Sequence, residues 1–213
     1  MNTTSTAFVV SATMLMVLAG NDAVHAAPTP TETVTNAIVK VMQILNDPLL
    51  MEAGMSEARR GEIENVVRAS ISYEEMARRS LGITWRDLNE SERQEFVHLF
   101  IRVLRDAVAC RMHDYSTTQV VYLSEQREGN FAEVRTLFKG AKVDTSIDVR
   151  LVNRSGDWLM YDAVIDGVSL VRNYQAQFVQ VIRDASYAGL VDRIEAKTLL
   201  QKTFERTHTL AGH

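Results

Sequence analysis

The sequence lacks most of the residues and motifs that mark an enzyme or a disulfide-stabilised secreted domain. It has one cysteine, Cys110, among 213 residues, which excludes an intramolecular disulfide, so packing must stabilise the fold. It contains no HExxH metal motif, no GxSxG nucleophile motif and no glycine-rich nucleotide loop. Basic residues are scattered and the formal net charge is −4, so nothing indicates nucleic-acid binding.

The N-terminus carries the longest apolar run, over residues 7–20. This run is short for a membrane span, and small residues around Ala26 follow it, as at a signal-peptidase site. The first basic side chain is Lys40, so the basic segment that usually precedes such a run is missing. We expect residues 1–26 to be a signal peptide cleaved after Ala26, and residues 27–213 to form one exported domain. A buried N-terminal helix or a retained anchor is the alternative.

Apolar residues at steps of three and four predict several helices in the first half of the chain. After a flexible leader over residues 27–31, we expect helices over 32–46, 56–69 and 72–81, the last ended by Gly82. Asn89 and Glu92 then form a variant of the capping box. The helix that follows has the broadest apolar stripe, made of Phe96, Leu99, Phe100, Val103, Leu104, Ala107, Val108 and Met112.

Beyond Tyr115 the apolar period changes to two, which predicts strands. The expected strands are 120–123, 131–139, 143–152 and 158–166, and glycine-containing turns between them predict antiparallel hairpins. A helix begins near Ser169, and Gly189 separates it from a last short helix over 190–204. The predicted fold is α+β: N-terminal helices, a four-stranded antiparallel curved sheet with helices on one face, and C-terminal helices.

Two groups of residues could bind a ligand, and each also has a plain structural explanation. Cys110 and His113 are three residues apart on one helix, but two ligands do not make a metal site, and Cys110 extends an apolar stripe. Arg78, Arg79 and Arg86 surround Trp85 in the sequence and could hold an anionic head group at a pocket mouth. A solvated helix face is the simpler interpretation of these arginines.

Asp162 and Asp166 share one face of the last predicted strand with apolar side chains. If that face pointed inward, burial would raise the pKa of a carboxyl there, and it could serve as a general base. The opposite face is more uniformly apolar, with Leu159, Tyr161, Ala163 and Ile165. We therefore expect the Leu159 face to point inward and the two aspartates to be solvated.

The last predicted strand and the helix after it resemble the signature of the MlaC family, also called the toluene-tolerance family. The matching stretch is WLMYDAVIDGVSLVRNYQAQFVQVI, in which the positions that follow the family's order and spacing are Trp158, Tyr161, Asp162, residues 167–171, Asn173, Tyr174, Gln177 and Phe178. A second block agrees at Met76, Ala77, Leu81, Gly82, Trp85, Arg86, Phe96, Phe100, Leu104 and Tyr115. The resemblance spans residues 32–202. The chain departs from the family at Asp166, Gln175 and Cys110, where glutamate, arginine and an aromatic residue are usual.

Members of this family are periplasmic phospholipid carriers that help to maintain the lipid asymmetry of the outer membrane. The resemblance implies a pocket for acyl chains between sheet and helices, phospholipid cargo in place of a cofactor, and no catalysis. It also implies a monomer that exchanges lipid with an inner-membrane ABC transporter complex and an outer-membrane lipoprotein complex. Arg78 and Arg86 are the expected head-group ligands. The expected pocket residues are Met76, Leu81, Trp85, Phe96, Phe100, Leu104, Val108, Val143, Ile147, Val149, Leu151, Tyr161, Ile165, Val168, Val171 and Tyr174.

Two other functions stay open on the residues alone. One is a cone-shaped α+β enzyme of the nuclear transport factor 2 type, with Asp162 as a buried base. The other is a periplasmic chaperone or adaptor with a solid core. The apolar stripes do not decide between a solid core and a cavity, because the same stripes would line either.

Overall fold

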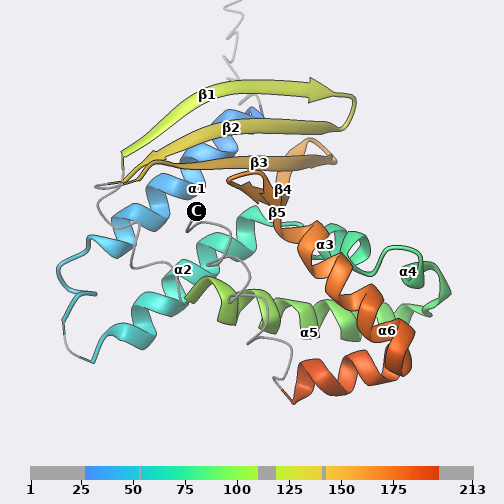
Figure 1. The fold of residues 1–213 in the computed structure, drawn as a ribbon. Coiled ribbons are helices and arrows are strands. Elements are labelled where there is room, and N and C mark those ends of the chain that lie inside the picture. Colours follow the sequence, from blue (N-terminus) through green and yellow to red (C-terminus); the bar gives the residue numbers. More distant parts are fainter. Residues whose placement is uncertain (1–26, 53, 110–118, 141–142, 197–213) are drawn as a thin grey trace, which may run out of the picture.

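The chain folds into helices gathered around a twisted antiparallel sheet (Figure 1). The computed structural model describes residues 27–52, 54–109, 119–140 and 143–196, with the backbone alone for 106–109. The predicted signal peptide, Cys110, His113 and everything after residue 196 lie outside these ranges. The described helices are α1 (Pro30–Leu45), α2 (Ser56–Ser70), α3 (Tyr73–Leu81), α4 (Thr84–Asp87), α5 (Glu90–Ala109) and α6 (Leu170–Glu195). None of them combines the length and hydropathy that a membrane crossing requires.

The sheet confirms the predicted α+β class and adds one short strand. Its strands run in chain order, each antiparallel to the next. They are β1 (Gln119–Glu128), β2 (Phe131–Lys139), β3 (Thr145–Arg154), β4 (Asp157–Ile165) and β5 (Val168–Ser169). Gly129 and Gly156 take positive φ angles in the two tight hairpin turns, a conformation that glycine adopts without strain. The third strand starts at Thr145, two residues later than predicted, and leaves Val143 75% exposed.

Side-chain caps fix where two helices begin. The Thr29 hydroxyl accepts from the Glu32 N–H at 3.2 Å, and the Glu32 carboxylate accepts from the Thr29 N–H at 2.7 Å, a complete capping box. The expected flexible leader over 27–31 is therefore wrong, because α1 already starts at Pro30. The predicted cap of α5 is confirmed, since Asn89 and Glu92 exchange the same pair of hydrogen bonds at 2.8 and 3.0 Å.

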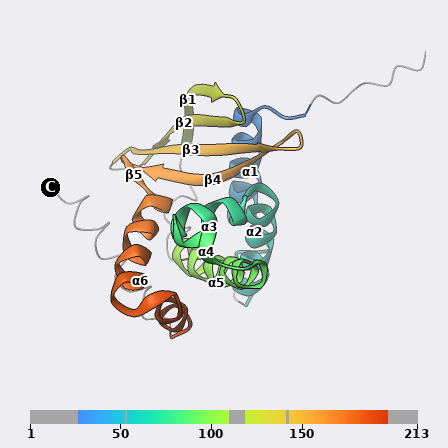
Figure 2. The ribbon, with the colours of Figure 1, turned by 90° about the vertical axis from the view of Figure 1, so that its right-hand side faces the viewer.

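Helices cover both faces of the sheet near β4, not one face as predicted. The chain crosses the β4 edge between α2 and α3, where Ile71 pairs with Met160 as a short parallel bridge and the Ser72 N–H donates to the Met160 carbonyl at 2.9 Å. In Figure 2 α3, α4, α5 and α6 lie below β4, whereas α1 stands alongside the strands and contacts β1, β2 and β4. Leu151 accordingly packs toward α1, while its neighbour Val152 packs toward the helices of the other side.

A β-bulge divides β4 and changes which side chains share a face. Arg150 pairs with Asp162 but Leu151 pairs with Met160, so Tyr161 is the extra residue. Before and after the bulge, the face toward α1 therefore carries Trp158, Met160, Ala163 and Ile165. The predicted inward face is therefore divided: Ala163 and Ile165 face α1, while Tyr161 is buried against the helices of the other side.

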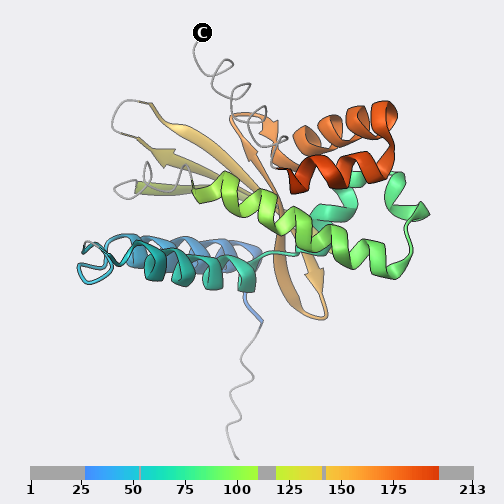
Figure 3. The same ribbon diagram turned by 90° about the horizontal axis from the view of Figure 1, so that it is seen from below.

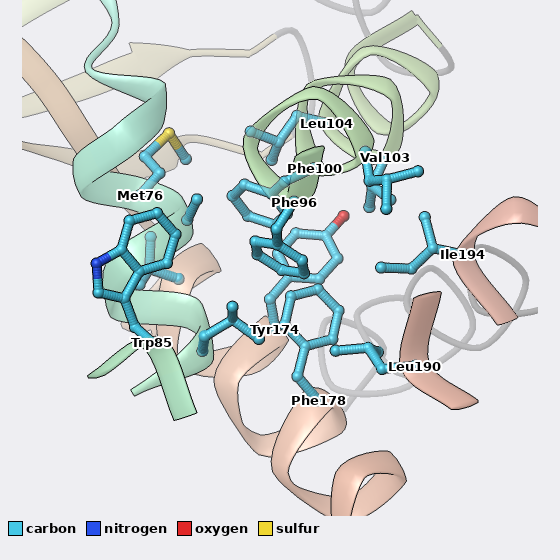
Figure 4. Close-up of a cluster of buried hydrophobic side chains, with 14 of the residues drawn as sticks. Met76, Trp85, Phe96, Phe100, Val103, Leu104, Tyr174, Phe178, Leu190 and Ile194 are labelled. Carbon is cyan, nitrogen blue, oxygen red and sulfur yellow. The ribbon is translucent and has the colours of Figure 1, made fainter. Parts of the chain in front are cut away.

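An aromatic core, made of Phe96, Phe100, Tyr174 and Phe178, joins α5 to α6 (Figure 4). The ring centroids lie 5.3 to 6.0 Å apart, mostly edge to face, the arrangement that aromatic quadrupoles favour. The chain then reverses at Ser186, whose φ is 66°, and returns Leu190 and Ile194 to the same core. The break predicted at Gly189 thus lies three residues earlier.

Candidate functional site

A wholly apolar cavity of about 250 Å³ lies between α1, α2 and the sheet. We call it the sheet cavity. Figure 3 shows α1 and α2 running side by side along one flank of the molecule. The side chains that line the sheet cavity come from those two helices, the segment after α2 and three strands. They are Val34, Ala37, Ile38, Val41, Met42, Leu45, Val66, Val67, Ile71, Phe138, Ile147, Val149 and Met160. Because no lining side chain offers a hydrogen-bonding or charged group, the cavity suits hydrocarbon.

A second cavity, of about 130 Å³, lies between α2, α3 and α5, and we call it the helix cavity. Its floor is apolar, with Ile63, Tyr73, Met76, Ile101, Leu104 and Leu170, and charged side chains such as Arg60 and Arg105 stand among its lining residues. Val67 and Ile71 line both this cavity and the sheet cavity. The end of α2 is therefore a shared wall between two apolar spaces.

A third, polar pocket of about 580 Å³ lies between α3, α4, the start of α6 and the far face of β3 and β4. We call it the arginine pocket, since it is lined by five arginines: Arg78, Arg79, Arg86, Arg150 and Arg172. Gly82, Ile83, Trp85, Tyr161, Asp162, Val171 and Gln175 complete the lining. It shares no lining residue with either apolar cavity.

Glu75 anchors the two α3 arginines of this pocket. Its buried carboxylate lies 2.6 Å from Arg78 Nη2 and 2.7 Å from Arg79 Nε, and 3.1 Å from Nη2 of Arg154 on β3. Burial raises the pKa of Glu75, but hydrogen bonds from Arg78 and Arg79 outweigh burial and hold the pKa below its ordinary value. Arg79 also lies over the Tyr161 ring, 4.2 Å from its centroid, which is cation–π contact distance.

Asp162 is buried and holds the start of α6. Its carboxylate accepts from the Ser169 hydroxyl at 2.6 Å, from the Val171 N–H at 3.0 Å and from Arg150 Nη1 at 3.2 Å. Ser169, the N-cap residue of α6, in turn accepts from the Arg172 N–H at 3.1 Å. The prediction that Asp162 is solvated is wrong, because the bulge turns it under α6. Its oxygens are occupied by structural donors, which leaves no free base there.

The structure distributes the sequence-predicted pocket residues over five places, apart from Val108 and the exposed Val143. Ile147 and Val149 line the sheet cavity, with Leu151 packed beside it, and Met76 and Leu104 line the helix cavity. The arginine pocket takes Trp85, Tyr161 and Val171 together with both expected head-group ligands, Arg78 and Arg86. Leu81, Phe96, Phe100 and Tyr174 are buried in the packed core between α3, α5 and α6. Ile165 and Val168 are half-buried where β4 meets β5, and the Val108 side chain lies outside the described part of the chain.

Tyr174 is a polar exception within the aromatic core. Its hydroxyl is buried and has no hydrogen-bond partner among the described residues. Burial raises the pKa of Tyr174 to about 12. Within the described residues, no group of three or more histidine, cysteine or acidic side chains is placed to hold a metal ion.

The sequence interpretation missed α1 as the main wall of the sheet cavity. Six lining residues lie on α1, at the spacing that had already predicted an amphipathic helix. The apolar stripe of Val34, Ala37, Ile38 and Val41 on α1 could have indicated this wall, because it presents a broad apolar face to its neighbours. Met160 was missed because the bulge at Tyr161 reverses its face.

The fold and its cavities define a class of small α+β proteins with internal apolar space. Over residues 35–196 the chain matches the family model described as MlaC protein, so it belongs to the MlaC family. Among solved structures it is similar to the phospholipid-binding protein from Ralstonia solanacearum, determined in complex with a phospholipid. That match has a TM-score of 0.68 and 20% sequence identity, and covers 77% of this chain and 93% of the Ralstonia chain. Comparison with curated protein sequences gave no match.

Proposed function

We propose that this protein is a phospholipid carrier that holds the acyl chains of its cargo in the sheet cavity. The observation that carries the proposal is a cavity lined only by apolar side chains in a member of the MlaC family. The likeness to a fold that was solved with a bound phospholipid supports it.

The energetics of lipid transfer explain why such a cavity is needed. Two acyl chains contain on the order of 30 methylene groups, and exposing them to water costs about 0.8 kcal/mol each, or roughly 25 kcal/mol together. A carrier must replace the bilayer interior with an equally apolar surface. The side chains of α1, α2 and β2–β4 supply that surface, and none of them would leave a buried polar group without a partner.

The size of the cavities indicates that loading requires the walls to separate. Pockets for small ligands occupy about 300–1,000 Å³, whereas the sheet cavity measures about 250 Å³ and the helix cavity about 130 Å³. Because Val67 and Ile71 border both, an outward shift of α2 would join the two spaces. We therefore place the second acyl chain on the far side of the shared wall. Lipid binding then selects a wider conformation.

Membership of the MlaC family supports a proposal for the cellular setting. We place the mature chain in the periplasm after removal of residues 1–26. There it would take a glycerophospholipid from one membrane complex and deliver it to another, with an outer-membrane lipoprotein complex and an inner-membrane ABC transporter as partners. This exchange would maintain the lipid asymmetry of the outer membrane. The transporter would supply the energy, and the carrier itself would catalyse no reaction.

Native mass spectrometry of the mature protein, expressed in a bacterium and purified without detergent, tests the proposal. We expect a stoichiometric adduct with the mass of a phospholipid that disappears on denaturation. The matched control is the same protein extracted, refolded and incubated with phospholipid vesicles, which should regain the adduct. A protein that stays free of lipid in both preparations would refute the carrier function and leave the solid-core adaptor.

A further inference from the structure

The arginine pocket carries more positive charge than its ion pairs neutralise. Five arginines and a single acid, Asp162, line it, although the whole chain has a net charge of −4. Glu75, the acid that anchors Arg78 and Arg79, is shared with Arg154, so one negative charge serves three positive ones. An excess of fixed positive charge in one hollow attracts anions.

Two of the five guanidinium groups have no partner among the residues that the structure describes. Arg150 is held by Glu133 at 3.1 Å and by Asp162 at 3.2 Å. By contrast, the side chains of Arg86 and Arg172 make no hydrogen bond or ion pair with any described residue, and both are exposed. They approach the pocket from different elements, α4 and α6. Their forked donors are therefore free for a ligand.

The other lining residues of the arginine pocket add a neutral hydrogen-bond donor and two aromatic rings. A Cβ atom at Gly82, where φ is 59°, would lie 2.7 Å from Nε2 of Gln175, so glycine lets this amide come close to the end of α3. Trp85 and Tyr161 supply aromatic faces. Both rings already lie against arginines, Trp85 against Arg93 at 5.7 Å and Tyr161 against Arg79 at 4.2 Å. These contacts hold the two aromatic rings in place, whereas the Arg86 and Arg172 guanidinium groups form no ion pair with a described acidic side chain.

From this geometry we propose that the arginine pocket is a binding site for a phosphate group, separate from the lipid cargo. Guanidinium forks bind phosphate oxygens in pairs, and several arginines around one hollow match the charge of a phosphate. The pocket shares no lining residue with the apolar cavities and lies on the opposite face of β3 and β4. Cargo held in the sheet cavity would leave it open. The phosphate comes either from solution or from lipid head groups at a membrane surface.

Trp85 provides a reporter inside the pocket. The chain has two tryptophans, so a Trp158→Phe background leaves Trp85 as the sole tryptophan, whose emission can be excited selectively. In that background, inorganic phosphate is titrated at constant ionic strength, with chloride as the comparison anion. We expect saturable quenching that weakens about tenfold or more in the double variant Arg86→Gln/Arg172→Gln, since each lost charged hydrogen bond costs that much in affinity. Arg102→Gln, an exposed arginine on α5 outside the pocket, is the matched control and should titrate like its parent.

A second arm separates the two sources of phosphate. Co-sedimentation with phosphatidylglycerol vesicles, compared with inorganic phosphate, uses the same three proteins. Vesicle binding that requires Arg86 and Arg172, without a response to inorganic phosphate, identifies lipid head groups. The reverse result identifies a soluble phosphate. The proposal is overturned if chloride quenches as phosphate does, if the double variant behaves like the control, or if neither probe binds. None of these results depends on whether the sheet cavity holds lipid.

Discussion

Filling the sheet cavity with a larger side chain should stabilise the lipid-free protein while blocking its cargo. Ala37 lies on α1, is 9% exposed and lines the cavity of about 250 Å³. In Ala37→Phe, burial of the new ring contributes about 1.5–3 kcal/mol, and the weaker helix propensity of phenylalanine costs about 0.5 kcal/mol. The free energy of unfolding should therefore rise by about 1–2.5 kcal/mol. Had α1 been packed tightly against the sheet, overpacking would instead cost about 1–3 kcal/mol.

The direction in which Ala37→Phe changes the free energy of unfolding tests whether the sheet cavity exists. Urea unfolding of the lipid-free protein gives the free energy of unfolding, and native mass spectrometry of protein purified from cells gives the bound lipid. Ala69→Phe, an exposed position on α2, controls for the helix-propensity cost and should keep its lipid. The reasoning is refuted if Ala37→Phe is destabilised by more than about 1 kcal/mol and still carries a full complement of phospholipid.

Three further substitutions test the polar groups around the cavities. Glu75→Gln should lower the free energy of unfolding by about 1–3 kcal/mol at pH 7. Because the folded-state pKa of Glu75 is depressed, the wild-type advantage should shrink as the pH falls below 4.5, and a difference that persists unchanged at low pH in urea unfolding would contradict this. Asp162→Asn should lose about 2–3 kcal/mol of stability but keep its lipid, since its oxygens cap α6; unchanged unfolding would show that the cap is unimportant. Tyr174→Phe removes an unpaired buried hydroxyl and should raise stability by up to about 1 kcal/mol, whereas a clear drop in the thermal midpoint would reveal a partner for that hydroxyl.

The periodicities were enough to predict the elements but not how they assemble. The three- and four-residue steps placed α2, α3 and the start of α5 within a residue or two, and alternation placed β2 and β4 equally well. The Thr29–Glu32 capping box was readable in the sequence and would have corrected the start of α1. These features are local, and local physics decides them.

The site depends on contacts that no local pattern contains. The β-bulge at Tyr161 changes which side chains of β4 share a face. As a result Met160 lines the sheet cavity in place of the expected Tyr161, and Asp162 is buried under α6. The α5 aromatic stripe was as suitable for a cavity as for a core, and only the arrival of Tyr174 and Phe178 from α6 fills the space beside it. Arg86 and Arg172 lie far apart in sequence, and only the folded chain brings them to one pocket.

The contact between α1 and β1 bears on the order in which the molecule folds. The Thr31 N–H and hydroxyl donate to the Glu125 carboxylate at 2.8 and 2.6 Å, across 94 residues of chain. A contact of such long range has a large loop-closure cost, and α1 can complete it only after the first hairpin of the sheet exists. We therefore expect this wall of the sheet cavity to dock last and to detach first. Amide hydrogens of α1 should exchange sooner than those of the aromatic core, and a newly made chain would become competent for its cargo only in the final step of folding.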